Sequence, residues 1–161
     1  EMCIRDRDRE EIVEEKFMEA VIRPARKSDV KNIAKLAGEL IPLEDLTKRN
    51  TMLMQSIDDS KRDIYVAEIK SEIVGFVDLW TFPDFVHGAN LTIIQNLVVS
   101  EAFRSRGIGD ELVRMAVKRA KGRKALELHA WTEFTNKPAI SLYAKHGLKK
   151  RALLLEKEFA E

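Results

Sequence analysis

The sequence lacks the features that mark several protein classes. Its 161 residues include a single cysteine, Cys3, so no disulfide can form within the chain, and this favours a reducing cytoplasm. No apolar run approaches the roughly 20 residues that span a bilayer, and the charged N-terminus does not read as a signal peptide. The 28 basic residues are balanced by 27 acidic ones, so the basic excess of nucleic-acid-binding proteins is missing. We expect a cytoplasmic protein that binds neither nucleic acid nor membrane. We expect no metal site either, because no His/Cys/Asp cluster has ligand spacing.

What is present is the composition of one folded domain. Hydrophobic residues make up 45% and charged residues 34%, which allows a packed core and a solvated surface. Residues 1–17 are expected to form an N-terminal tail outside this domain. The run from Met2 to Arg7 resembles a translated sequencing-library adapter, and the residues after it are mostly charged. A native, exposed helix is the alternative. The domain itself is expected at residues 18–161.

Apolar periodicity predicts interleaved helices and strands. Strands are predicted at 20–23, 63–70, 73–80, 91–99, 125–131 and 152–159, and helices at 28–40, 44–57, 108–121 and 136–146. Ser28 is predicted to cap the first helix. Residues 81–90 are predicted to be a loop because they contain Pro83 and Gly88. This order predicts an α/β (α+β mixed) fold, with a central mixed, mostly antiparallel sheet flanked by helices in a single domain.

The stretch from Leu97 to Asp110 carries the strongest chemical signal. A buried strand ends there, the chain turns, and Gly107 and Gly109 open a helix. The first amides of a helix lack intrahelical partners and lie at the positive end of its dipole. Glycines let a ligand approach the backbone, and Arg104 and Arg106 add positive charge. The pattern predicts an anion site in which backbone amides hold a diphosphate.

Two common phosphate motifs do not fit this stretch. A P-loop needs Lys after its last glycine, where this chain has Asp110, and this weakens a P-loop-type nucleotide-binding module. A dinucleotide fingerprint needs a third small residue where Leu112 stands. The stretch instead resembles the signature Arg/Gln-x-x-Gly-x-Gly/Ala of the GNAT superfamily of N-acetyltransferases, matched by Arg104, Gly107 and Gly109.

A second match to the same superfamily lies downstream. Its late motif, Asn-x-x-Ala-x-x-x-Tyr-x-x-x-Gly-Phe, is similar to the run containing Asn136, Ala139, Tyr143 and Gly147, with Leu148 in place of the Phe. The resemblance covers residues 20–159 in element order, and its sharp motifs fall within 97–148.

The resemblance implies an enzyme that transfers acetyl from acetyl-CoA directly to a primary amine. No nucleophile–base pair stands out in the sequence, so no covalent acyl-enzyme is expected. The acceptor stays open between a small-molecule amine and a protein lysine or N-terminus. Whether the chain forms a homodimer also stays open. The alternative function is a catalytically silent acyl-CoA-binding or sensor domain, favoured by a missing carboxylate described below.

The resemblance also implies where acetyl-CoA binds. The main chain of Leu97, Val98 and Val99 would pair with its pantetheine arm, and the Leu97 amide would polarise the thioester carbonyl. The pyrophosphate would lie on Arg104, Ser105, Arg106, Gly107, Ile108, Gly109 and Asp110. The side chains of Asp110 and Glu111 are expected to point away from it. Asn136 would hydrogen-bond the pantetheine amide, or simply cap its helix.

The catalytic groups are less clear in the sequence. By resemblance, Tyr143 contacts the cofactor and donates a proton to the departing thiolate; the alternative is a core aromatic. Relatives place a Glu two or four residues before Leu97, where this chain has Gln95 and Ile93, and neither accepts a proton at neutral pH. Gln95 is expected to orient a relay water instead. The base stays open among Asp78, Asp84, Glu133 and His87.

The remaining histidines and the acceptor site complete the expectations. His129 and His146 are expected to be structural. The acceptor site is expected between residues 44–59 and the loop 81–90, whose carboxylates either attract a cationic amine or are simply solvated.

Overall fold

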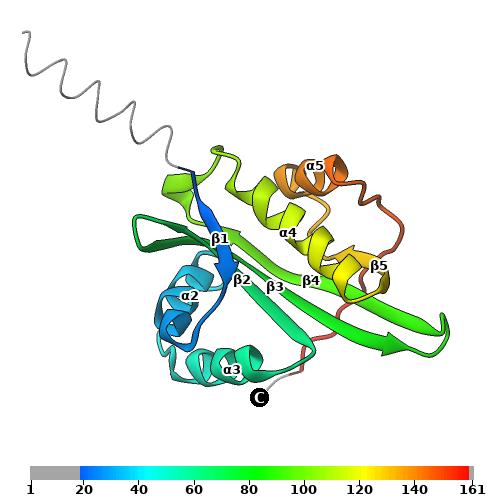
Figure 1. Cartoon of the computed structure of the whole chain (residues 1–161), viewed down its shortest axis with the longest axis horizontal. Helices are drawn as coiled ribbons and strands as arrows, with labels where there is room; N and C mark the ends of the chain where they lie inside the picture. The colour runs from blue at the N-terminus through cyan, green and yellow to red at the C-terminus, as the bar shows by residue number, and fades with distance from the viewer. Residues whose placement is uncertain (1–18, 160–161) are drawn as a thin grey trace, which may run out of the picture.

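The computed structural model describes residues 19–159, in which one sheet carries helices on both faces (Figure 1). Its five strands lie in sequence order: β1 (Val21–Pro24), β2 (Arg62–Ile69), β3 (Glu72–Asp84), β4 (Ala89–Val99) and β5 (Ala125–Ala130). Pairing is antiparallel except between β4 and β5, which run parallel. The prediction of a mixed, mostly antiparallel sheet is confirmed. The predicted tail, residues 1–17, lies outside the described residues.

The helices divide between the two faces. The first group is η1 (Lys27–Asp29), α2 (Val30–Leu36), η2 (Ala37–Glu39) and α3 (Thr47–Asp58). The second group is η3 (Glu101–Phe103), α4 (Ile108–Gly122) and α5 (Lys137–Lys145). Figure 1 shows α2 and α3 on one side of the sheet and α4 and α5 on the other. Among the described residues, no helix is both long and apolar enough to cross a membrane.

Each face of the sheet has its own apolar cluster, because side chains alternate along the strands. Val77 of β3 packs with Leu112 of α4 in what we name the α4 cluster, and both are fully buried. The neighbouring Phe76 faces the other way and packs with Ile33 of α2 in what we name the α2-side cluster. Burying one such side chain contributes about 2 kcal/mol, so the two clusters fix the positions of α2 and α4 over the sheet.

The predicted loop at residues 81–90 is wrong. Both strands continue through it as a long hairpin whose turn is only residues 85–88. Thr81 and Thr92 pair across the strands, and their buried hydroxyls hydrogen-bond at 2.8 Å. This cross-strand pairing outweighs Pro83, which stands next to the end of β3 and opposite Asn90.

The predicted last strand at residues 152–159 is also wrong, since no strand forms there in the described chain. Leu153, Leu154 and Leu155 are 62%, 56% and 83% exposed. Three leucines in succession cannot all face one side of a sheet, because the side-chain period of a strand is two. β5 therefore remains the edge strand.

The first helix begins differently from the prediction. Ser28 does not cap it; the chain enters through η1, and Asp29 accepts the Arg26 N–H at 2.7 Å. The buried carboxylate of Asp29 also receives two hydrogen bonds from Arg23 of β1, at 2.8 and 3.0 Å. The Arg23 guanidinium lowers the pKa of Asp29. This ion pair joins β1 to the start of α2.

Replacing Asp29 by asparagine should lower stability at pH 7 by about 2 kcal/mol, because the half-buried Arg23 loses one of its two carboxylate partners and keeps only Glu68. A lowered folded-state pKa gives stability that is present at neutral pH and is lost as the pH falls below about 4. The wild-type advantage in thermal melts should therefore shrink as the pH is lowered below about 4. Asp58→Asn is the control, since its ion pair with Lys27 is exposed and should matter little. An equal loss in both variants would contradict this account of Asp29.

Candidate active site

The sheet opens between β4 and β5. Their pairing ends at Ile94 opposite Ala130, whereas β4 continues to Val99. In the described chain, residues 95–99 therefore have a strand neighbour only on the β3 side. The side chains of Leu97 and Val99 pack against the α4 cluster. These side chains can pack in the core while the backbone of the same residues stays open to a ligand.

A β-bulge marks the beginning of this opening. Asp78 pairs with Asn96, and the next residue of β3, Leu79, pairs with Ile94, so Gln95 is the extra residue. Bulges redirect side chains and are frequent beside active sites. The predicted catalytic residue Gln95 therefore stands where β4 loses β5.

The opening leads to the N-terminus of α4. Gly107 is the N-cap residue, with φ +83°, and no side chain caps the helix. The first main-chain bond of the helix runs from the Glu111 N–H to the Gly107 carbonyl at 3.1 Å. The amides of Ile108, Gly109 and Asp110 are therefore without intrahelical acceptors. A Cβ at position 107 would meet no atom within 4 Å, so the backbone is open to a ligand.

The two glycines of the signature, Gly107 and Gly109, have different structural roles. Ser105 and Gly107 both have positive φ, a loop conformation of the kind in which successive backbone N–H groups can form an anion-binding concavity. Gly109 allows close packing, because a Cβ there would lie 3.2 Å from the Leu142 side chain of α5 and 3.8 Å from that of Val99. The first feature is suited to an anion, and the second brings α5 close to the opening.

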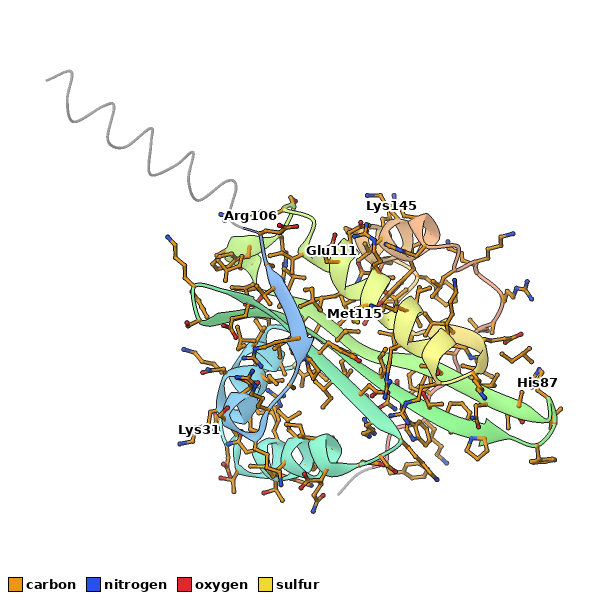
Figure 2. The ribbon with its side chains drawn as sticks, in the orientation of Figure 1. Lys31, His87, Arg106, Glu111, Met115 and Lys145 are labelled. Atoms are coloured by element: carbon orange, nitrogen blue, oxygen red, sulfur yellow. The ribbon has the colours of Figure 1, made fainter. Side chains whose placement is uncertain are left out.

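The arginines of the loop are already engaged. Arg104 forms an ion pair with Glu39 of η2 at 3.0 Å, and its Nε donates to the Val99 carbonyl at 3.0 Å. Glu39 also accepts the Glu101 N–H at 3.0 Å, a connection that the sequence did not indicate. Arg106 is exposed, 5.1 Å from the Phe103 ring centroid (Figure 2). The backbone, more than these guanidinium groups, faces the candidate anion position.

The Asp110 side chain contacts residues of α4 and of the end of α5, in keeping with the expectation that it points away from a phosphate. Its carboxylate lies 2.9 Å from His146 Nε2 and 3.0 Å from Arg114 Nη2. The His146 contact lowers the pKa of Asp110. His146 thus connects the end of α5 to the first turn of α4, the structural role expected for it.

Helix α5 carries Tyr143 into the same region. Its ring is 9% exposed and packs in the α4 cluster, and burial raises the pKa of its hydroxyl. Within residues 19–159 the hydroxyl makes no hydrogen bond that would occupy it. Asn136 caps α5 by accepting the Ala139 N–H at 3.2 Å, which confirms the capping role; its amide nitrogen is not used in that bond.

The structure separates the candidate bases. Asp84 and His87 bind each other at 2.5 Å beside the hairpin turn, and Figure 2 shows His87 at the far end from Arg106. Asp84 lies six positions after Asp78 along β3, a distance of about 20 Å. His129 is exposed and contacts Glu127 at 2.7 Å. Strands replace the predicted loop at residues 81–90. This part of the predicted acceptor site therefore lies toward the hairpin turn and away from the opening.

Asp78 belongs to a polar cluster that the sequence did not reveal. The Nη1 atom of Arg62 donates to Gln95 Oε1 at 2.6 Å and lies 3.2 Å from both carboxylate oxygens of Asp78. Asn96 donates to Asp78 at 3.2 Å. Burial raises the pKa of Asp78, and the charge of Arg62 opposes that rise. The available signal was a single aspartate between the apolar residues Val77 and Leu79.

Comparisons with known proteins agree with this geometry. The family model described as the Acetyltransferase (GNAT) family matches residues 29–148. An N-alpha-acetyltransferase of Sulfolobus acidocaldarius is 30% identical over 140 residues, covering 83% of this chain and 82% of its own. A streptothricin acetyltransferase of Escherichia coli is 36% identical over 97 residues, covering 57% of this chain and 51% of its own.

Solved structures show the same fold. The structure of an aminoglycoside N-acetyltransferase in complex with CoA superposes with a TM-score of 0.76 at 17% identity. The match covers 88% of this chain and 97% of that one. At this identity the likeness concerns the fold alone.

Proposed function

This chain belongs to the GNAT acetyltransferase family and is an N-acetyltransferase, and on that premise we propose that the opening between β4 and β5 is its active site. Enzymes of the family use acetyl-CoA. The observation that carries the proposal is the uncapped N-terminus of α4, which the chain reaches from the unpaired edge of β4 through η3 and the glycine loop. The strand edge and the helix N-terminus together offer a row of main-chain donors and acceptors, in which the Val99 carbonyl already accepts from Arg104.

The residues present fit acetyl-CoA along this row. The pantetheine arm would pair with the main chain of residues 97–99, as a strand pairs with a free edge. The pyrophosphate would accept the amides of Ile108, Gly109 and Asp110 at the positive end of the α4 dipole. Asn136 would offer its free amide nitrogen to the arm. The Leu97 amide would stabilise the charge that develops on the thioester oxygen.

The chemical step is attack of a neutral amine on the thioester carbon. The carbon–nitrogen bond forms, the carbon–sulfur bond breaks, and Tyr143 would give its proton to the departing sulfur. Its raised pKa keeps the hydroxyl protonated at neutral pH. Because the hydroxyl makes no bond to the described residues, it is available to the sulfur.

The acceptor that we propose to test first is a peptide α-amine. The support is the N-alpha-acetyltransferase relative, which aligns over most of both chains. The test measures release of the CoA thiol from acetyl-CoA with a panel containing short peptides with free N-termini, lysine-containing peptides blocked at the N-terminus, spermidine and an aminoglycoside. Turnover confined to small polyamines would contradict the peptide class. Binding of acetyl-CoA without turnover of any amine would favour the silent binding domain.

Gln95→Ala should reduce kcat at least tenfold while the KM for acetyl-CoA changes little, because Gln95 contacts Arg62 and not the loop before α4. Its Oε1 accepts from Arg62, so its NH2 group is what it presents to a water or an amine. Asn90→Ala is the matched control, on the same strand but toward the hairpin turn. Equal kcat values for wild type and Gln95→Ala would remove Gln95 from the mechanism.

A further inference from the structure

We propose that Asp78 accepts the proton of the acceptor amine, through a water held by the Gln95 amide, and that Arg62 positions both side chains. This proposal rests on the function proposed above and assigns the base that the sequence left open. The argument concerns the cluster of Arg62, Asp78, Gln95 and Asn96, which we name the bulge cluster.

The bulge cluster lies on the opposite face of the sheet from Tyr143. Val77 and Leu79 pack toward α4, so Asp78 between them faces the side of α2 and α3. Tyr143 packs in the α4 cluster. The acid and the proposed base therefore flank the same opening of β4 from its two faces. Tyr143 would serve the sulfur from one face of the sheet, and Asp78 would serve the amine from the other.

The surroundings of Asp78 are suited to accepting a proton. From β2 it is faced by the charge of Arg62 and from β4 by the neutral amide of Asn96. The helices on this face, α2 and α3, bring apolar side chains such as Ile33 and Leu53 to the neighbouring cluster. Burial in this setting raises the pKa of Asp78, which makes its carboxylate a better base than an exposed one. One Arg62 nitrogen bridges Asp78 and Gln95, which keeps the two together.

The proton balance closes with these groups. The substrate ammonium loses one proton to Asp78, and the neutral nitrogen then attacks the thioester carbon. Tyr143 protonates the sulfur, and the second proton leaving the nitrogen restores the tyrosine. Asp78 releases its proton to solvent after the acetylated product departs. The net reaction converts an ammonium and a thioester into an amide, a thiol and one released proton.

The test compares Asp78→Asn with wild type over pH 6–10, using the amine from the panel above that wild type acetylates fastest. The variant should lose about tenfold in kcat/KM for each pH unit below the amine pKa, which is about tenfold at pH 7 for a peptide α-amine of pKa about 8. The deficit should shrink as the pH rises, because free amine then arises without a base, until the two rates converge near the amine pKa. A constant deficit over the whole range would show a structural role and overturn the proposal.

Asp63→Asn is the matched control for the loss of a buried carboxylate. Asp63 forms ion pairs with Arg119 and Arg123 at 2.9 Å each, and its side chain is as buried as that of Asp78. It precedes Ile64 of the α2-side cluster and so lies on the α4 face. Its replacement should lower the melting temperature and leave the pH profile unchanged. A pH-dependent deficit in this control would also count against the proposal.

A second measurement needs no variant, in case Asp78→Asn does not fold. With an enzyme base, the acid limb of the wild-type kcat/KM profile stays at one pH for amines of different pKa, such as a peptide α-amine at about 8 and spermidine at about 10. A limb that follows the amine pKa would refute Asp78 as the base. Failure of every amine in the panel would instead refute the proposed function.

Discussion

Tyr143→Phe should lower kcat by about 10² or more, the usual loss when an acid catalyst is removed. The substitution keeps the ring that packs in the α4 cluster and removes only the hydroxyl. No bond between that hydroxyl and the described chain is lost, so the melting temperature should stay within a few degrees. The affinity for CoA should also change little, because the main chain makes the contacts proposed for it. Steady-state kinetics and thermal melts with and without CoA measure all three quantities.

The chain provides its own control for this experiment. Its two tyrosines are Tyr65 and Tyr143, and Tyr65 of β2 packs at the margin of the same cluster. Tyr65→Phe should leave kcat unchanged. If Tyr143→Phe keeps full turnover, the thiolate departs without help from this hydroxyl, and Tyr143 is only a core aromatic.

Gly107→Asp should abolish binding of CoA and acetyl-CoA. A ligand at 100 times its Kd stabilises the folded state by about 2.7 kcal/mol, which would raise the melting temperature by several degrees in wild type. The new carboxylate would stand where the pyrophosphate is proposed to accept amides, adding bulk and like charge. The fold should survive, because no atom lies within 4 Å of the new Cβ and aspartate tolerates a positive φ better than most residues.

Two variants separate charge from backbone strain in this prediction. Gly107→Asn imposes the same strain without the charge and should retain part of the melting shift. Gly88→Asp places the same residue at another open glycine of positive φ, in the hairpin turn, and should bind CoA as wild type does. A normal melting shift in folded Gly107→Asp would show that the pyrophosphate lies elsewhere.

Elements that depend on local signals were predictable from the sequence. Helix α4 was expected at 108–121 and runs over Ile108–Gly122, because its apolar stripe and its opening glycines are contiguous. The β3–β4 hairpin was cut short because Pro83 and Gly88 look like loop residues in isolation. The last predicted strand failed for the opposite reason: its apolar residues favour burial, yet they do not alternate.

The candidate site also has one part that local sequence signals predict and one part that they do not. The loop before α4 is one stretch of chain, so sequence reasoning could find it. In the bulge cluster, Arg62 binds Asp78, which is 16 positions away in the sequence, and Gln95, which is 33 positions away. Its formation requires a one-residue shift in the β3–β4 register, and no local pattern in the sequence announces such a shift.

The free edge of β4 and the uncapped α4 have a consequence for how this enzyme tolerates mutation. If the cosubstrate is held by peptide groups, alanine substitutions cannot delete the donors, since every residue except proline carries the same N–H. An alanine scan of residues 97–110 should therefore look nearly silent for CoA binding. Proline at 108–110 and substitutions at Gly107 should stand out, because they alter the peptide groups themselves. The side chains at such a site can be substituted while the main chain continues to bind the cosubstrate.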